Sequence, residues 1–220
     1  MSLRASKAYK GIAMEGIIAR WYAKTARRDD EFKSLVSRVS EILTAGSRVL
    51  EVAPGPGYLS IDLAKLGKYQ VTGLDISKSF VEIARTNARQ AGVQVDFRHG
   101  NAADMPFADE TFDFIICTAA FKNFTQPVQA LAEMYRVLRP NGEALISDLR
   151  RGAAQADINQ TVNRMGLNRV NDFITKWTFR HFLLKNAYTP EEIRRFAAQT
   201  HFRQCEIRED AIGMEIWLEK

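Results

Sequence analysis

The sequence predicts an α/β protein built on a doubly wound, mostly parallel sheet of seven strands. Between residues 48 and 148, five apolar segments alternate with helical patterns, as in a parallel sheet covered by helices. The segment 112–117 is continuously apolar except for Asp113, which is typical of a strand at the buried centre of such a sheet. Two alternating segments, 204–208 and 214–218, predict a closing hairpin whose last strand runs antiparallel.

Each element has its own local signal. Apolar residues at helical spacing predict a helical segment over 14–43, broken near residues 27–30. Ser77 is suited to cap a helix through residue 90, and Thr189 followed by Pro190 and Glu192 marks another helix start. Gly67 is a plausible C-cap for the helix that follows the first strand. The remaining predictions are strands over 48–52, 69–75, 94–98, 112–117 and 143–148, and helices ending near 66 and over 127–138.

We expect one domain over residues 1–220. It divides into an N-terminal helical arm (1–45), a core (46–149), a basic helical lid (150–188), and a closing helix and β-hairpin (189–220). The lid lacks a strand pattern and is rich in aromatic residues, namely Trp177, Phe179, Phe182 and Tyr188.

Composition and charge narrow the class of protein. No apolar run is long enough to span a bilayer, the N-terminus has no signal-peptide pattern, and a cytoplasmic location is expected. Cys117 and Cys205 are interpreted as buried thiols, and no Cys/His cluster has metal-ligand spacing. Residues 1–49 carry ten Lys/Arg against five Asp/Glu, residues 50–150 ten against twelve, and residues 151–203 nine against four. If the two basic segments meet over a site, its mouth is positive.

The segment from Glu51 to Gly57 is the most informative local feature. A strand ends in Glu51, a turn containing Gly55 and Gly57 follows, and the next strand ends in Asp75. Such a turn lets a ligand approach the backbone, and two nearby carboxylates suit a nucleoside with a cationic tail. The third glycine of a dinucleotide-binding turn is replaced by Ser60, which argues against a pyrophosphate ligand. The structural alternative is that the glycines serve only a tight turn and the acids are solvated.

Further motifs follow in order: 99–107 after the third strand, 117–124 after the fourth, and 133–142 at the end of a helix. Together with the glycine turn, this region from Arg48 to Asp148 resembles the class I S-adenosylmethionine (SAM) dependent methyltransferases, in their ubiquinone/menaquinone-biosynthesis-like branch. The resemblance implies a Rossmann-like fold and SAM as the cofactor, with S-adenosylhomocysteine as its product.

The resemblance also implies individual roles in holding SAM. Glu51 would face the cationic amino group, Asp75 would accept hydrogen bonds from the ribose hydroxyls, and Ile76 would pack on the adenine. Asn101 stands where this branch usually has Asp, so its carbonyl would accept from the adenine amino group. The other implied contacts are backbone at Ala53, Gly55, Ala102 and Thr118, and the close approach that Gly57 permits.

Two departures from the family pattern matter, and the second concerns catalysis. Ala53 replaces the first glycine of the turn, and residues 120–124 are Ala-Phe-Lys-Asn-Phe where relatives often have Ala-Leu-His-His-Phe. A histidine suspected of acid/base work is therefore missing, and no catalytic residue is assigned. The weak candidates are Lys122, Asn123, His181 and Tyr22, with Tyr9 and Tyr188 as further tyrosines that could face the site and His99 and His201 interpreted as structural.

The function expected from the resemblance is methyl transfer to a small-molecule or lipid-like acceptor, with the choice of an N, O or C nucleophile open. The basic segments and Lys122 favour an anionic acceptor. Modification of RNA or protein is the alternative, although a nucleic-acid partner is disfavoured because no binding module is appended. A SAM-binding protein without catalysis is another alternative, peripheral membrane contact through the lid is a further hypothesis, and the oligomeric state is left open.

Overall fold

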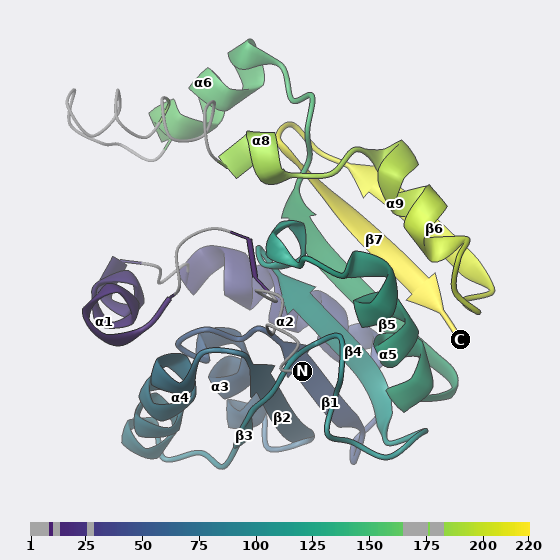
Figure 1. Ribbon diagram of the computed structural model, residues 1–220. Helices are drawn as coiled ribbons and strands as arrows, with labels where there is room; N and C mark the ends of the chain where they lie inside the picture. Colours follow the sequence, from purple (N-terminus) through teal and green to yellow (C-terminus); the bar gives the residue numbers. More distant parts are fainter. Residues whose placement is uncertain (1–8, 11–13, 26–28, 165–175, 177–182) are drawn as a thin grey trace, which may run out of the picture.

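The computed structural model describes residues 9–10, 14–25, 29–164, 176 and 183–220 (Figure 1). Its seven strands form one sheet in the order β3-β2-β1-β4-β5-β7-β6, and among them β7 is the strand that runs antiparallel to its neighbours. The predicted fold class is therefore confirmed. The strands are β1 Arg48–Val52, β2 Gln70–Asp75, β3 Asp96–His99, β4 Phe112–Thr118, β5 Leu138–Leu149, β6 Gln204–Glu209 and β7 Gly213–Glu219. The helices are α1 Gly16–Thr25, α2 Asp29–Ile42, α3 Tyr58–Lys65, α4 Lys78–Gln90, the 3-10 turn η1 Phe121–Asn123, α5 Pro127–Val137, α6 Gln155–Arg164, α8 Leu184–Asn186 and α9 Pro190–Ala197.

Helices cover both faces of the sheet (Figure 1). On one face α2 and α3 pack against the central strands, and α4 packs beside them against Phe97 of β3. On the other face α5 and α9 cover the half of the sheet that contains β4, β5 and β7. Successive residues of a strand point to opposite faces, so β4 gives Phe114 and Ile116 to one layer and Ile115 and Cys117 to the other. This two-sided burial explains its continuous apolar sequence.

Two strands start two or more residues away from the sequence prediction. Pairing of β3 with β2 begins at Asp96 rather than at residue 94. β5 begins at Leu138 rather than at residue 143, because Leu138 pairs with Phe112 before the register shifts between Phe112 and Phe114. At this irregularity a Cβ on Gly142 would lie 2.9 Å from the Arg139 carbonyl and 3.0 Å from the Asp113 carbonyl. Residues 139–142, which follow the predicted helix over 127–138, are thus part of one long strand.

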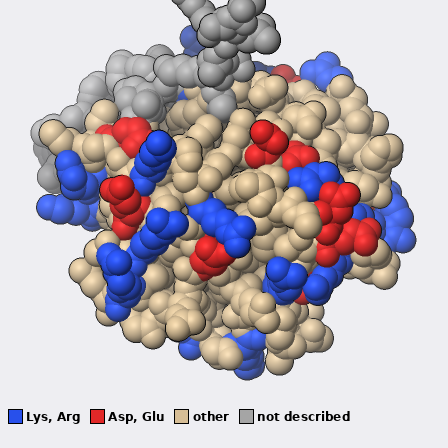
Figure 2. Space-filling model, turned by 60° about the horizontal axis from the view of Figure 1, so that its bottom comes forward, with Lys and Arg blue, Asp and Glu red and all other residues tan. Residues whose placement is uncertain are grey.

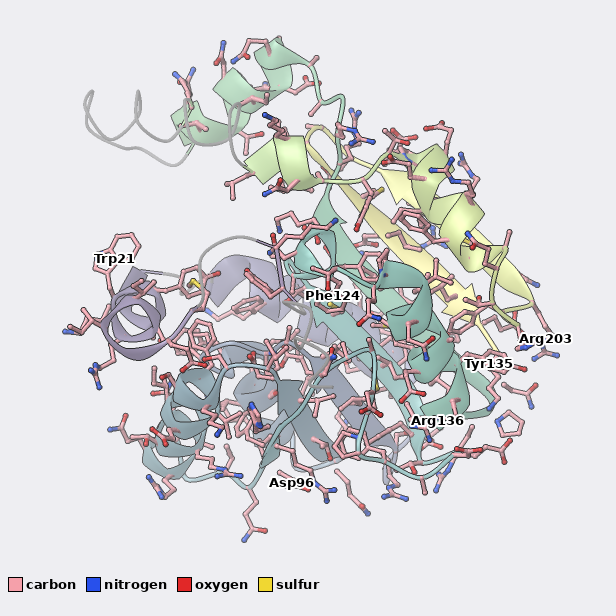
Figure 3. All side chains as sticks on the ribbon, viewed as in Figure 1. Trp21, Asp96, Phe124, Tyr135, Arg136 and Arg203 are labelled. Atoms are coloured by element: carbon pink, nitrogen blue, oxygen red, sulfur yellow. The ribbon has the colours of Figure 1, made fainter. Side chains whose placement is uncertain are left out.

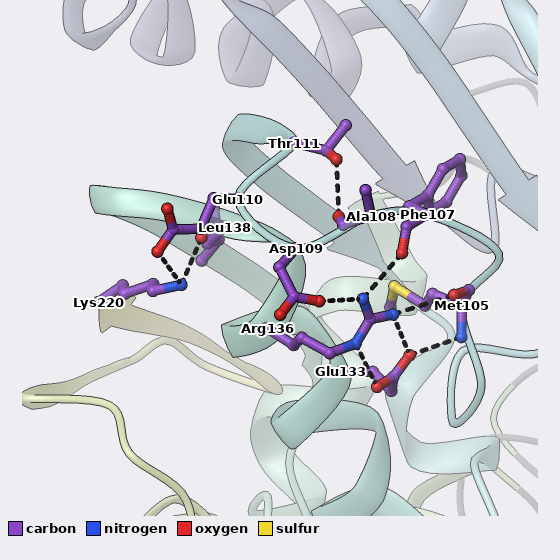
Figure 4. Close-up of polar contacts among 10 residues, drawn as sticks. All are labelled: Met105, Phe107, Ala108, Asp109, Glu110, Thr111, Glu133, Arg136, Leu138 and Lys220. Atoms are coloured by element: carbon purple, nitrogen blue, oxygen red, sulfur yellow. Dashed lines mark hydrogen bonds and ion pairs between the residues drawn. The ribbon is translucent and has the colours of Figure 1, made fainter.

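Arg136 of α5 holds the segment between β3 and β4 against the helix (Figure 4). Its guanidinium donates to the carbonyl oxygens of Met105 and Phe107 at 3.0 and 2.8 Å, and to the carboxylates of Glu133 and Asp109. Glu133 in turn accepts from the Met105 backbone amide at 2.7 Å. A planar guanidinium with five fixed donors suits such a network better than a lysine would. Apart from the spacing of Glu133 and Arg136, nothing in the sequence predicts this network.

The ends of the chain pack around this core. The predicted break in the first helix lies between α1 and α2, and residues 26–28 are outside the described residues. Ser77 caps α4 and accepts from the Phe80 amide, and Thr189 and Glu192 form the predicted capping box of α9. Of the helices in the described ranges, none combines the length and apolar character needed to cross a membrane.

Candidate cofactor site

The carboxyl ends of the parallel strands bring the predicted site residues to one edge of the sheet. Glu51 lies on β1, Asp75 ends β2, Thr118 ends β4 and Asp148 lies near the end of β5. The strand register brings these residues close together. Glu51 lies opposite Gly73, two residues before Asp75, and Thr118 lies opposite Ser147, next to Asp148. Open α/β sheets bind their ligands at this edge.

Glu51 is buried among apolar residues, with 2% of its surface exposed. Its carboxylate accepts a short hydrogen bond from the Ser60 hydroxyl. Burial raises the pKa of Glu51 to about 7, although the Ser60 hydrogen bonds act in the opposite direction. A buried acid whose bonded partner is neutral would gain most from a cation placed beside it.

Asp75 has a similar environment. It is 5% exposed, and its two oxygens accept from the backbone amides of Gly55 and Ser77 at 2.9 and 2.8 Å. Burial raises the pKa of Asp75 to about 6, again against the effect of these hydrogen bonds. A carboxylate has about four acceptor positions, so two remain for ligand hydroxyls. The same bonds tie the acid to the glycine turn and to the start of α4.

The turn between Glu51 and α3 has three residues in the left-handed region: Ala53 at φ 58°, Gly55 at 54° and Gly57 at 79°. Ala53 therefore adopts a backbone conformation that favours glycine. A Cβ on Gly57 would lie 2.6 Å from Phe97 Cζ and 2.9 Å from Ala84 Cβ, whereas one on Gly55 would meet nothing within 4 Å. The missing side chain of Gly57 thus makes room for packing under the turn, and Gly55 leaves open space. The close approach of a ligand at Gly57 stays a prediction.

The adenine side of the expected site is only partly arranged for a ligand. Ile76 directly follows Asp75 and is 38% exposed, which leaves apolar surface for a base. The Asn101 side-chain oxygen already accepts from the Ala103 amide at 3.0 Å, and Ala102 is half-buried between them. His99 is exposed, and its Nε2 lies 3.1 Å from the Ile76 carbonyl oxygen, which fits the structural interpretation of this histidine.

Lys122 does not present a free charge, contrary to the expectation from sequence. It is 5% exposed, and its ammonium lies 2.7 Å from an Asp148 oxygen and 2.6 Å from the Ala119 carbonyl. Asp148 also accepts from the backbone amides of Lys122 and Leu149. The two basic residues after β5 are engaged as well: Arg150 donates to the Asp210 and Ala211 carbonyls, and Arg151 pairs with Glu192. An acceptor anion would therefore compete with Asp148 for Lys122, and the anion contact expected from the sequence gains no support from these contacts.

The N-terminal arm reaches the site, and sequence reasoning did not anticipate how. Glu15 accepts from the Lys78 and Ser79 amides at 3.0 and 3.1 Å, and Ser77 donates to the Met14 carbonyl, so the arm caps α4 beside Asp75. Further along the edge, Tyr9 pairs with Phe124 in an antiparallel bridge, and the Lys10 amide donates to the Asn123 carbonyl oxygen. Burial raises the pKa of the Tyr9 phenol to about 12, with smaller contributions from Tyr22, Asp75 and Asp148.

The other catalytic candidates lie as follows. Asn123 is the last residue of η1, and Tyr22 packs its ring edge against Phe80 with centroids 5.8 Å apart. Tyr188 is buried against Phe121 and accepts from the Lys10 ammonium at 2.5 Å. His201 packs near Tyr135, away from the edge. His181, and three of the lid aromatics (Trp177, Phe179 and Phe182), lie outside the described residues.

A hollow lies at the opposite edge of the sheet. Its volume is about 910 Å³, and it is lined by the first residues of four strands together with Arg85, Arg89 and Arg98. Figure 2 brings this side forward and shows Lys and Arg next to Asp and Glu rather than a patch of one sign. The amino ends of parallel strands are not where such folds bind cofactors, so we place the site at the carboxyl edge.

The comparisons with known proteins identify the family of this site. Residues 50–146 match the family model described as a methyltransferase domain. A demethylmenaquinone methyltransferase of Deinococcus radiodurans is 35% identical over 100 residues, covering 45% of this chain and 42% of the relative. A ubiquinone/menaquinone biosynthesis C-methyltransferase of Roseobacter denitrificans is 38% identical over 105 residues, covering 46% and 42%. Residues 50–146 therefore match a methyltransferase domain, and this part of the chain is similar to SAM-dependent methyltransferases of the ubiquinone/menaquinone-biosynthesis-like branch.

Solved structures support the fold. A SAM-dependent methyltransferase described as putative, from Methanococcus maripaludis, superposes with a TM-score of 0.76 at 20% identity, covering 100% of this chain and 97% of that one. A [4+2]-cyclase superposes with a TM-score of 0.65 at 19% identity, covering 85% and 80%. The fold alone therefore does not determine the reaction. The matching segment also spans less than half the length of the curated relatives.

The described residues fit SAM, the cofactor of this family. Two buried carboxylates with neutral hydrogen-bond partners suit a ligand that brings a cation and two hydroxyls. Gly55 leaves its upper side open, and Ile76 offers apolar surface next to Asp75. In the described ranges there is no group of three or more His, Cys, Asp or Glu side chains that could hold a metal ion.

Proposed function

We propose that this protein transfers a methyl group from SAM to a small quinone-type acceptor. The observation that carries the proposal is the pair of buried acids, Glu51 and Asp75, on either side of a left-handed turn. Their raised pKa values mean that the ligand-free site bears the cost of two poorly solvated carboxylates. A ligand with a cationic amino group and a ribose offsets that cost at both positions.

SAM supplies a methyl group that is already activated on a sulfonium, so the protein needs mainly to bind, orient and exclude water. We assign Glu51 to the cationic amino group, Asp75 to the ribose hydroxyls and Ile76 to the face of the adenine. The backbones of Ala53, Gly55, Ala102 and Thr118 complete the cofactor contacts, and Asn101 faces the adenine amino group. Arg136 supports the last of these contacts indirectly, because it fixes the segment that follows Asn101.

The proposed acceptor class is supported by the relatives' names and by the aromatic residues at the part of the carboxyl edge beside β4 and β5. Phe121 and Phe124 lie edge to face with centroids 5.4 Å apart, and Tyr188 packs on Phe121 at 5.9 Å. Tyr9 adds a phenol that stays protonated at neutral pH. With Lys122 neutralised by Asp148, this region favours a flat, largely apolar acceptor over an anionic one. We leave the methylated atom to product analysis.

Binding tests the cofactor assignment directly. Calorimetric titration should show that SAM and S-adenosylhomocysteine bind and that NADH does not. Asp75→Ala should cost about 1.5–3 kcal/mol of cofactor affinity, the range for hydrogen bonds to a charged group. Asp62→Ala, which removes an exposed carboxylate on α3, is the matched control and should bind normally. Unchanged affinity in a folded Asp75→Ala protein would contradict the assignment.

Turnover tests the acceptor. S-adenosylhomocysteine should form when the protein is given SAM and a short-chain demethylmenaquinol, and mass spectrometry of the product separates C-methylation from O-methylation. Addition of salt should change the rate little, because the described charges beside the site are paired. Product formed only with RNA or protein would favour the alternative acceptors. SAM binding without turnover on any acceptor would favour a non-catalytic SAM-binding protein.

A further inference from the structure

The helix α1 exposes an apolar surface that the proposed methyl transfer does not use. Ile17 is 79% exposed, Ile18 44% and Trp21 65%. Figure 3 shows Trp21 projecting from α1 on the side away from α4. The opposite side of the same helix is buried, with Ala19 at 0% and Ala23 at 8% exposed. The helix is thus anchored on one side and apolar on the other.

The residues of α1 fall into three sectors. At about 100° per residue, Ile17, Trp21 and Ile18 occupy one sector of roughly 100°. Arg20 and Lys24 occupy the sector next to it, and both are exposed. The remaining sector is the one that packs on the core. A helix with an exposed apolar strip beside basic residues and with a tryptophan in the strip has the composition of helices that lie in a membrane interface.

Charge selects the occupant of this surface. Residues 1–28 carry seven Lys/Arg and one acid, Glu15. The carboxylate of Glu15 is directed to the Lys78 and Ser79 amides of α4, so it does not offset the charge beside the strip. We propose that α1 docks this protein on an anionic phospholipid surface, with Ile17, Ile18 and Trp21 in the interface and Arg20 and Lys24 at the headgroups.

Docking in this orientation places the site next to the lipid. Immediately before α1, Met14 and Glu15 contact the first turn of α4, which follows Asp75 and Ile76. The start of α1 is held there too, because the Gly16 amide donates to the Ser79 hydroxyl at 2.9 Å. The carboxyl edge of the sheet would therefore lie close to the bilayer, where an apolar acceptor is concentrated. The inference itself concerns binding to lipid and is independent of the reaction.

Sedimentation with vesicles tests the proposal. The full chain should sediment with vesicles made of equal parts phosphatidylcholine and phosphatidylglycerol, and more weakly with phosphatidylcholine alone. Ile17→Ser combined with Trp21→Ser should weaken partitioning roughly tenfold or more, because two large apolar side chains no longer enter the interface. Arg20→Gln combined with Lys24→Gln should lower the affinity for the anionic vesicles roughly tenfold. The affinity for the two vesicle types should then be similar.

Exposed apolar residues elsewhere give the control. Ile42→Ser combined with Leu66→Ser changes two side chains that are 47% and 40% exposed on other elements, and this variant should bind vesicles like the unaltered protein. Circular dichroism and SAM titration verify that each variant is folded. Absence of sedimentation with anionic vesicles would overturn the proposal, as would equal binding by the Ile17/Trp21 variant. Dimerisation without lipid that is lost in this variant would instead identify a second copy of the chain as the occupant.

Discussion

Two buried regions that contain acids lie at the same edge of the sheet, and they differ in the groups that bond to the carboxylates. Glu51 and Asp75, at the ends of β1 and β2, are bonded to a hydroxyl and to backbone amides. Asp148, on β5, is bonded to the ammonium of Lys122 at 2.7 Å as well as to two amides. All four side chains are at most 7% exposed, so burial alone does not separate the two groups.

The difference shows how a ligand-binding site can be distinguished from an ion pair that stabilises the fold. The buried charge of Asp148 is compensated within the chain, and the pair holds η1 against β5. Glu51 and Asp75 accept hydrogen bonds from neutral groups only, and burial raises the pKa of both acids. We propose that a bound ligand offsets this cost, with its cationic group beside Glu51 and its hydroxyls at Asp75. The sequence places Lys122 just after β4, at the edge where an acceptor would bind, and this position suggested that its charge contacts the acceptor. Its pairing with a carboxylate 26 residues away could not be deduced from spacing.

The largest effect is expected from breaking the compensated pair. Asp148→Ala leaves the Lys122 ammonium buried without a carboxylate and should lower the free energy of unfolding by about 3–5 kcal/mol. Urea unfolding measures this. The more exposed Lys65–Asp62 pair on α3, at 2.8 Å, is the matched comparison, and Asp62→Ala should cost at most about 0.5 kcal/mol. Similar losses from both variants would contradict the contrast between the two regions.

A second expectation concerns the uncompensated acids and pH. The pKa of Glu51 is about 7 in the folded protein and 4.5 ordinarily, so between these values the folded state holds a proton that the unfolded chain has released. Stability from this group is therefore highest below pH 4.5 and falls as the pH rises to about 7. The full change is on the order of 3 kcal/mol.

Glu51→Gln isolates this contribution. The variant should gain stability relative to the unaltered protein as the pH rises through that window, measured by urea unfolding without ligand. SAM affinity should behave in the opposite way and fall as the pH drops below about 7, because the ammonium requires the ionised acid. Parallel stability curves for the two proteins across the window would show that Glu51 is compensated after all.

A third expectation separates packing from ligand access in the turn beside Glu51. Gly57→Ala should destabilise by about 1–3 kcal/mol more than Gly55→Ala, because both have positive φ but only Gly57 faces Phe97. Phe97→Leu in the Gly57→Ala background should recover part of the loss. For Gly55→Ala, the loss in the free energy of SAM binding should exceed the loss in the free energy of unfolding. Equal destabilisation would mean that backbone strain, not the ring of Phe97, determines the need for glycine.

The sheet, the glycine turn and the helix caps were predictable because each rests on local patterns: strand alternation, φ-permissive residues and capping side chains. The register shift at Gly142 was not, because it depends on backbone contacts with β4. Nor was the docking of Glu15 on α4, because its two partners lie more than 60 residues away. The domain boundaries and the closing of residues 150–188 over the site stay predictions.

The smallest expected effect concerns one alanine in each region. Ala53 follows β1 near Glu51 with φ 58°, and Ala119 follows β4 near Lys122 with φ 55°. An alanine in the left-handed region bears a strain of order 1–3 kcal/mol, while glycine there costs about 0.5–1 kcal/mol of extra entropy on folding. Ala53→Gly and Ala119→Gly should each raise the free energy of unfolding by up to about 1 kcal/mol. If the turn near Glu51 is shaped for a ligand, Ala53→Gly should also change SAM affinity, whereas Ala119→Gly should change stability alone.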